Sequence, residues 1–323
     1  MNLLGNLDCE ARWAGVALPD AVARRISLYA PLFAACAPCS PDAPDAVPHA
    51  IWVPAPIDPA RLLAHPGWTP PMVHVSPRSS LAPAFDLAWA DPSARAANDR
   101  ADTLAIAEAL GVALPGARLV ASLAEVDDAA AALAGRPWIC KARWTAAGRD
   151  RALGAGPPEG ESRARVARLL KRLGPLVFEP WLDRVADFGL CGEVTATGEV
   201  VLREPHRIAT DGRGGFLGIE LEPTLDPARA AAMAATARAA AEMVATRTGY
   251  RGPFAIDAFV YRHASGTQEL HPLCEFNARH SFGWIAWALS ARLGVRRLGF
   301  DAPPPGARVL IAPAEDRITA WCA

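Results

Sequence analysis

Two carboxylates and an amide in the last quarter of the chain could together bind a hard metal ion. Asp257 lies in an apolar run that is typical of a strand, and Glu275 and Asn277 lie in the next such run. Because side chains alternate along an extended segment, Glu275 and Asn277 point to the same face. Carboxylate and amide oxygens are the ligands that Mg²⁺ prefers, also where it holds nucleotide phosphates. The spacing therefore predicts a magnesium site, with Arg279 close to where phosphoryl charge would develop.

Lysine usage singles out one further residue. The chain has 33 lysine and arginine residues, of which only Lys141 and Lys171 are lysine. A lysine that persists in a chain so biased toward arginine is expected where a compact point charge on a flexible side chain is needed. Lys171 lies in an amphipathic helical pattern and is interpreted as a solvated side chain. Lys141 ends the apolar run 137–141, so it is predicted to point into the space beyond the end of a strand.

A transition-metal site is a weaker interpretation of the same region. His271, Cys274 and His280 are ligand types that bind zinc or copper. Alternation along the strand, however, points Cys274 away from the face that His271 shares with Glu275. The sequence therefore argues against an ion shared by these three residues.

The elements that must position these residues indicate a mixed α/β (α+β) protein. The first 95 residues combine strand-like runs at 50–53 and 72–75 with a helical pattern at 21–35. The strands between 175 and 277 include a hairpin turned at 197–198 and two late strands without an intervening helix. They are predicted to form a largely antiparallel sheet that faces a second α/β lobe carrying Lys141. The other helices are expected at 99–110, 122–134, 161–173, 227–247 and 282–293, and a glycine-containing loop at 145–160.

Composition and missing motifs exclude several classes of function. The formal net charge is -1 and no long basic run occurs, so nucleic acid is not expected as a partner. Apolar stretches are interrupted well short of a membrane span, and the N-terminus lacks the pattern of a signal peptide. Seven scattered cysteines, with one CxxC at 36–39 that has no second pair, predict a reduced cytoplasmic protein without a zinc site. P-loop, GxSxG, HExxH and Rossmann glycine motifs are missing.

Five ordered elements between residues 96 and 295 resemble the ATP-grasp enzymes, which activate carboxylates with ATP. The elements are Arg100, Lys141, the segment 179–187, Asp257, and Glu275 with Asn277. The resemblance implies the ATP-grasp fold, in which two α+β lobes hold ATP between them. It also implies a small N-terminal α/β domain at 1–95, a small lobe covering the nucleotide at 96–180, and a C-terminal lobe with the metal and substrate site at 181–323.

The resemblance further implies which residues bind the nucleotide. Lys141 and Arg100 would contact the phosphates, with the loop 145–149 closed over them. In similar enzymes a hinge glutamate and the backbone that follows it bind the adenine, and a later carboxylate binds the ribose hydroxyls. The matching residues of this chain are Glu179, Trp181 and Leu182 for the adenine and Asp187 for the ribose.

The activity implied by the resemblance is that of an ADP-forming carboxylate–amine ligase. Two Mg²⁺ ions, replaceable by Mn²⁺, would be held by Asp257, Glu275 and Asn277 and would bridge the phosphates of ATP. A substrate carboxylate would attack the γ-phosphorus to give an acyl phosphate. An amine would then displace phosphate, with a thiol or hydroxyl as the alternative nucleophile. Lys141 and Arg279 would stabilise the charge that develops.

Several alternatives stay open from the sequence alone. The substrates would be a small carboxylate and an amine, with an amino acid or peptide among the candidates, and a homodimer is open as the assembly. A kinase of the same fold would release a stable phosphorylated product, and a catalytically silent protein would only bind nucleotide. Arg203, His206 and Arg207 each could approach the phosphates or the acceptor, and the sequence does not choose among them.

Overall fold

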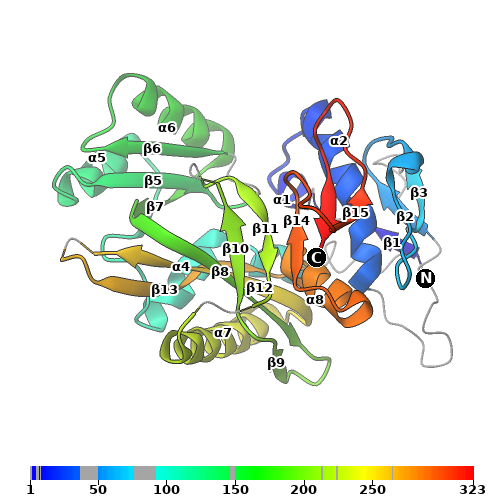
Figure 1. The fold of residues 1–323 in the computed structure, drawn as a ribbon. Coiled ribbons are helices and arrows are strands. Elements are labelled where there is room, and N and C mark those ends of the chain that lie inside the picture. The colour runs from blue at the N-terminus through cyan, green and yellow to red at the C-terminus, as the bar shows by residue number, and fades with distance from the viewer. Residues whose placement is uncertain are drawn as a thin grey trace.

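The residues that the structure describes form three separate sheets, of three, nine and four strands (Figure 1). The computed structural model describes residues 2–4, 7, 9–36, 50–75, 92–145, 150–211, 214–222, 225–263 and 265–323. Helices pack on the sheets, so the predicted mixed α/β class is confirmed. Among the described helices, none is both long and apolar enough to cross a membrane.

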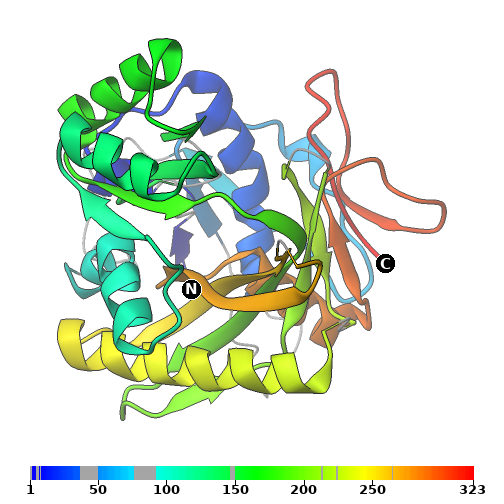
Figure 2. The ribbon, with the colours of Figure 1, turned by 90° about the vertical axis from the view of Figure 1, so that its left-hand side faces the viewer.

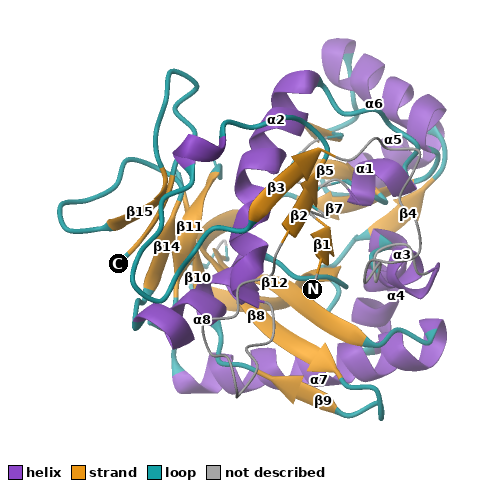
Figure 3. Cartoon of the chain, turned by 90° about the vertical axis from the view of Figure 1, so that its right-hand side faces the viewer, coloured by secondary structure: helices purple, strands orange, loops and turns teal. Residues whose placement is uncertain are grey.

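Short parallel strands form the N-terminal sheet in the order β1, β2, β3 (Figure 3). They span Asn2–Leu4, Ala50–Val53 and Met72–Val75. The accompanying helices are α1 (Cys9–Trp13), α2 (Asp20–Tyr29) and the 3₁₀ helices η1 (Ala30–Cys36) and η2 (Pro59–Arg61). The helix expected at 21–35 is α-helical only to Tyr29, because Pro31 has no N–H with which to continue it.

The four-stranded sheet is antiparallel and has the order β4, β7, β5, β6. Its strands span Arg118–Val120, Leu176–Pro180, Pro137–Ala142 and Arg151–Ala155, and helices α5 (Leu123–Ala132) and α6 (Gly160–Leu173) pack on it. Two expectations are corrected here. The strand at 175–179 joins this sheet and not the larger one, and residues 151–155 form a strand where a loop was expected. A Cβ at Gly154 would lie 2.2 Å from the ring of buried Trp138, so this strand approaches β5 through a glycine.

The nine-stranded sheet is antiparallel throughout, as predicted for the residues after the hinge. Its order is β13, β12, β8, β10, β11, β14, β16, β15, and β9 pairs with β8. In chain order the strands β8 to β16 span Asp183–Val194, Val200–Leu202, His206–Thr210, Phe216–Glu220, Gly252–Arg262, Gln268–Asn277, Arg297–Gly299, Arg308–Ile311 and Ala320–Cys322. The hairpin β10–β11 and the three strands after residue 296 had no sequence expectation, because each is only three to five residues long.

Four helices pack around the large sheet. Helix α7 (Pro227–Thr248) runs along one face, in yellow in Figure 2, and begins at Asp226, whose carboxylate accepts a hydrogen bond from the Arg229 N–H at 3.0 Å. Helix α8 (Phe282–Leu293) directly follows β13 and ends at Gly294 in the left-handed conformation. The remaining two are α3 (Pro92–Ala97) and α4 (Arg100–Ala109).

Helix α4 links the two larger sheets. It contacts β7 of the four-stranded sheet and β13 of the nine-stranded sheet. The four-stranded sheet thereby stands over the β12–β13 end of the large sheet (Figures 1 and 2). The opposite end of the large sheet shares a hydrophobic core with the N-terminal sheet, η1 and α8. These packings bring the chemistry-bearing residues to the junction between β12, β13, α4 and β5.

Candidate active site

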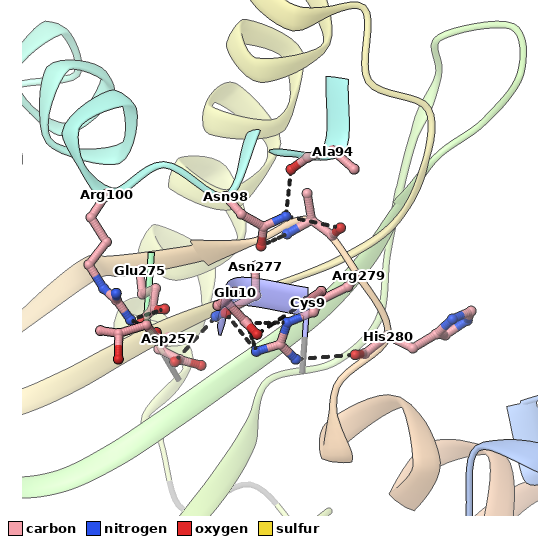
Figure 4. A network of polar contacts seen from close by, with 12 residues as sticks. Cys9, Glu10, Ala94, Asn98, Arg100, Asp257, Glu275, Asn277, Arg279 and His280 are labelled. Atoms are coloured by element: carbon pink, nitrogen blue, oxygen red, sulfur yellow. Dashed lines mark hydrogen bonds and ion pairs between the residues drawn. The ribbon is translucent and has the colours of Figure 1, made fainter. Parts of the chain in front are cut away.

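Strands β12 and β13 place two carboxylates side by side. Asp257 is the register partner of Glu275, and Ala255 is the partner of Asn277. Burial raises the pKa of Asp257 to about 7, and the adjacent charge of Glu275 acts in the same direction. The predicted metal donors are thus neighbours in the folded chain (Figure 4).

A bulge in β13 corrects the alternation expected from the sequence. Asp257 pairs with Glu275, but Phe259 pairs with His271, so four steps along β13 face two steps along β12. The bulge breaks the strict alternation of faces. Cys274 therefore does not point away from the site: its Sγ lies 3.7 Å from Nη2 of Arg184. Burial raises the pKa of Cys274, while the charge of Lys141 acts to lower it, which places Lys141 close to β13.

Asn277 and Arg279 extend the carboxylate pair into a polar network. The Asn277 amide donates to Oδ2 of Asp257 at 3.4 Å, and Nη2 of Arg279 donates to Oδ1 of Asn277 at 3.3 Å. Asn98, between α3 and α4, fixes the backbone at this point: its Oδ1 accepts the N–H of Ala278 at 3.0 Å. The end of β13 is held from outside its own sheet by this amide (Figure 4).

Arg279 is paired with a residue that the sequence analysis did not identify. Glu10 of α1 accepts hydrogen bonds from Nε and Nη2 of Arg279 at 2.7 and 2.6 Å. Glu10 is only 4% exposed. Burial acts to raise the pKa of Glu10, but the charge of Arg279 and the hydrogen bonds to the carboxylate together outweigh burial, so the pKa is lowered and the carboxylate is ionised. Nothing in the sequence distinguishes Glu10 from an ordinary surface glutamate, since its partner lies 269 residues away.

Arg100 lies at the start of α4 and spans three elements. Its guanidinium donates to the carbonyl oxygens of Ala142 at 3.0 Å and Thr145 at 2.6 Å, and to Oε1 of Glu275 at 2.6 Å. Asp99, which caps α4 through the Ala101 N–H, also pairs with a neighbouring arginine at the end of β5. Arg100 therefore joins the end of β5 to the predicted metal-donor strand. Most of the loop expected over the phosphates, residues 146–149, lies outside the described residues.

Lys141 and Glu179 form an ion pair on the four-stranded sheet. Their Nζ and Oε2 atoms lie 2.5 Å apart, with side chains 15% and 13% exposed. Burial by itself lowers the pKa of Lys141, but Glu179 outweighs it and the pKa is raised. A narrow cavity between α4, β7 and β13 is lined by residues that include Arg100, Glu179, His271 and Cys274. The predicted phosphate lysine and the predicted adenine glutamate thus contact each other at its edge.

In the segment after β7, one backbone N–H group that was expected to bind adenine has another partner. The backbone N–H of Trp181 donates to the Pro137 carbonyl at 2.8 Å, so it is not directed at a ligand. Arg184, which the sequence analysis missed, has its guanidinium carbon 4.0 Å from the ring centroid of Phe259 and 5.4 Å from that of Trp181. Its Nη1 donates to Asp187 at 3.1 Å. The predicted ribose carboxylate is therefore held by a cation that lies between the hinge and β12.

The structure separates the three basic candidates after β9. Arg203 is exposed and stacks 5.1 Å from the ring of Trp284, whereas Arg207 lies 3.8 Å from Glu220 on the sheet surface. His206 is 3% exposed and pairs with Gly189, which on its other side is the partner of Asp257. A Cβ at Gly189 would lie 2.4 Å from Nε2 of His206. The missing side chain of this glycine lets the imidazole lie across β8.

These donors fit a hard divalent cation. Two carboxylates and an amide oxygen form an all-oxygen set, and a cation bound by both carboxylates would offset the repulsion between their charges. Among the described residues, no group of three or more His, Cys, Asp or Glu side chains is arranged to hold a metal ion. The third donor of the predicted set is accordingly Asn277, an amide. A bound cation would compete with Arg100 for Glu275 and with Arg279 for Asn277.

Comparisons with known proteins identify similar solved structures. No protein-family model and no curated protein matches the chain. N5-carboxyaminoimidazole synthetase from Staphylococcus aureus, complexed with ADP, aligns with 58% of this chain and 46% of its own at 14% identity, with a TM-score of 0.42. This chain thus spans less than half of that structure.

Two further structures give similar values. N5-carboxyaminoimidazole ribonucleotide synthetase from Thermus thermophilus aligns with 70% of this chain and 67% of its own at 18% identity, with a TM-score of 0.48. The biotin carboxylase domain of the Hydrogenobacter thermophilus 2-oxoglutarate carboxylase, in complex with MgADP, ADP and bicarbonate, aligns with 70% of this chain and 61% of its own. Its identity is 15% and its TM-score 0.49.

Proposed function

We propose that this protein is an ATP-dependent, ADP-forming ligase that joins a carboxylate to an amine through an acyl phosphate. The observation that carries the proposal is the meeting of two kinds of group at one place. The buried carboxylate Asp257 and its neighbour Glu275 suit a divalent cation, and Arg100 and Lys141 suit phosphate oxygens. Phosphoryl transfer needs both, because the metal and the cations share the charge of the transferred group.

The metal donors have a defined role in this proposal. Asp257, Glu275 and Asn277 would hold Mg²⁺, with Mn²⁺ as a substitute, and a second ion would share the carboxylates. When bound, the metal supplies charge neutralisation at the β- and γ-phosphates. The chain's own residues orient it, since Asn98 fixes the backbone beside Asn277 and the register fixes the two carboxylates.

Nucleotide binding would proceed by exchange of ion-pair partners. Phosphate oxygens would take Lys141 from Glu179 and would share Arg100 with Glu275. Glu179 is then free to accept from the adenine amino group, with the N–H of Leu182 as the backbone donor of the hinge. The ribose hydroxyls would compete with Arg184 for Asp187. In this scheme residues 96–180 are the lobe that covers the nucleotide, 181–323 carry the metal and substrate site, and 1–95 shape the acceptor side.

The second half-reaction would use the end of β13. Arg279 lies two residues beyond Asn277, and its guanidinium would stabilise the acyl phosphate and the tetrahedral intermediate formed by the attacking amine. The acid and the amine are small molecules in this proposal, with an amino acid or peptide as one class to test. The cysteines of the described residues form no disulfide, which suits a reducing cytoplasm.

An isotope experiment tests the mechanism. Small carboxylates are screened with ATP, Mg²⁺ and hydroxylamine, which traps an acyl phosphate as a hydroxamate. The active acid is then labelled with ¹⁸O in its carboxylate and supplied with an amine. The proposal expects one ¹⁸O in inorganic phosphate, together with ADP. Label retained in a stable phosphorylated product would indicate a kinase, label in AMP would indicate adenylation, and no turnover with any acid would indicate a silent nucleotide-binding protein.

A further inference from the structure

A buried ion pair joins the N-terminal segment to the metal-donor strand. Glu10 lies on α1 and Arg279 follows β13, and their side chains are 5% and 15% exposed. Both Nε and Nη2 of Arg279 donate to the same oxygen of Glu10, and the Cys9 thiol donates to the other oxygen at 3.1 Å. Taking two charges out of water is unfavourable unless the geometry is well satisfied. A pair this well satisfied fixes the orientation of Arg279.

Arg279 also contacts the end of β13 and its own chain neighbour, His280. Nη2 also donates to Oδ1 of Asn277 at 3.3 Å, and Nη1 donates to the His280 carbonyl at 3.4 Å. Asn277 in turn donates to Asp257. A continuous chain of polar contacts therefore runs from Glu10 through Arg279 and Asn277 to Asp257 (Figure 4).

Two carboxylates, Asp257 and Glu275, could compete with Glu10 for the guanidinium of Arg279. Among the described residues, only the side chain of Asn277 links this guanidinium to Asp257, and Glu275 is the register partner of Asp257. A guanidinium without Glu10 would be attracted to the two carboxylates, because they lie close to it and repel each other.

We infer that Glu10 is a positioning residue that holds Arg279 away from the carboxylates that bind the metal. This inference rests on the proposed function for the identity of the metal site. Glu10 touches neither metal nor substrate in this arrangement. It keeps Asp257 and Glu275 available to a divalent cation and keeps Arg279 beside them for the acyl phosphate. The N-terminal segment is then part of the active site.

The test compares the Mg²⁺ requirement of four proteins. Binding of ADP is measured by calorimetry over a series of Mg²⁺ concentrations for wild type, Glu10→Gln, Arg279→Met and the double variant. Loss of Glu10 is expected to raise the half-saturating Mg²⁺ concentration about tenfold, a size typical of residues that orient metal ligands. The effect should vanish in the Arg279→Met background, since no guanidinium then competes. An equal Mg²⁺ requirement in wild type and Glu10→Gln would overturn the inference, as would a wild type that binds no Mg²⁺.

A control separates positioning from loss of stability. Trp13 lies on the same helix and packs against the core beneath the large sheet. Trp13→Ala should lower the melting temperature at least as much as Glu10→Gln but change the Mg²⁺ requirement less than about twofold. A similar rise of the Mg²⁺ requirement in both variants would show that α1 acts only through packing.

A second measurement needs neither metal nor activity. Phenylglyoxal modifies accessible guanidinium groups, and peptide mass spectrometry reports each arginine separately. Modification of Arg279 in the metal-free protein should be several-fold faster in Glu10→Ala than in wild type, while the surface residue Arg172 should react equally in both. Equal rates at Arg279 would contradict the inference. Failure of all acids in the hydroxamate screen would overturn the ligase proposal and leave both of these tests unaffected.

Discussion

Two charged clusters approach each other from the four-stranded and nine-stranded sheets, and burial has opposite outcomes in them. In the first, burial acts to lower the pKa of Lys141, yet Glu179 at 2.5 Å outweighs it and the pKa is raised. In the second, burial raises the pKa of Asp257 to about 7, and Glu275 reinforces the shift. A buried charge with a partner of opposite sign keeps its charge, and one beside a like charge tends to lose it.

This difference bears on the order of events in binding. The cluster on the small sheet pairs opposite charges, so in the proposed function phosphate would have to displace Glu179 before it could contact Lys141. The cluster on the large sheet carries two carboxylates, and Arg100 and Arg279 are shared with other acceptors. In the proposed function, a divalent cation would supply the positive charge that these two carboxylates share. Metal and nucleotide would therefore contact different sheets in this proposal, and variants of each sheet should have separable effects.

The largest expected effect is on the nine-stranded sheet. Glu275→Gln should lower Mg²⁺-dependent turnover more than about 100-fold, because it removes a charged metal donor while keeping a hydrogen-bond acceptor for Arg100. Steady-state ADP release at several Mg²⁺ concentrations measures it. Glu220→Gln is the matched control, since Glu220 also pairs with arginine on this sheet and its side chain is 27% exposed against 25% for Glu275. Wild-type turnover in Glu275→Gln would remove this residue from the site.

The next effect concerns the four-stranded sheet. Lys141→Ala should weaken the binding of ATP roughly tenfold or more, because one charge-assisted contact is worth about 1.5–3 kcal/mol. The variant should bind adenosine as tightly as wild type does, because the lysine would contact phosphates and not the base. Lys171→Ala is the natural control, because Lys171 is the only other lysine of the chain and is exposed on α6. If the binding of ATP and that of adenosine weaken equally, the substitution has damaged the sheet and the phosphate-binding role of Lys141 is wrong.

The third prediction uses a second buried group of the large sheet. Burial lowers the pKa of His206 to about 4 from its ordinary value of 6.5, and its Nδ1 has no hydrogen-bond partner among the described residues. The unfolded chain therefore takes up a proton between these values while the folded chain does not. Stability should be fully present above about pH 6.5 and should fall as the pH is lowered toward 4, by about 2 kcal/mol between pH 7 and pH 5.

The measurement is urea denaturation of wild type and His206→Asn over this pH range. The variant has no imidazole to protonate in either state, so the difference in unfolding free energy between the two proteins should change with pH in the stated direction. Two parallel curves would show that His206 is not buried as a neutral base. The constant offset between the curves reports only the lost packing between Gly189 and Gly283.

The adjacency of the proposed metal donors was predictable because its signal is local. Asp257 and Glu275 each lie in a long strand with strong β-forming neighbours, and antiparallel pairing of consecutive strands brings them into register. Lys141 was identified because the chain has so few lysines. Long helices with clear caps, such as α7, were predicted for the same reason, since Asp226, Pro227 and Gly249 mark both of its ends within the sequence.

Errors arose where a short element depends on its neighbours. Residues 151–155 contain glycine and were expected to form a loop, but they form strand β6. Glycine is needed at position 154 because the ring of Trp138, on the neighbouring strand β5, occupies the space of a side chain. The face of the strand to which Cys274 points was predicted wrongly, because alternation assumes a regular strand. A bulge between paired strands cannot be recognised from either strand alone.

The sequence by itself determined which residue types could bind metal and phosphate, and which strands carry them, because these properties depend on spacing within a few residues. Tertiary structure decided the partners. Glu10 reaches Arg279, Arg100 reaches Glu275 and His206 lies across Gly189 only once distant segments pack together. Electrostatic interactions act through space over a few ångströms, whereas these pairs are separated by up to 269 positions in the chain. The charge state of the site is therefore a property of the packed protein.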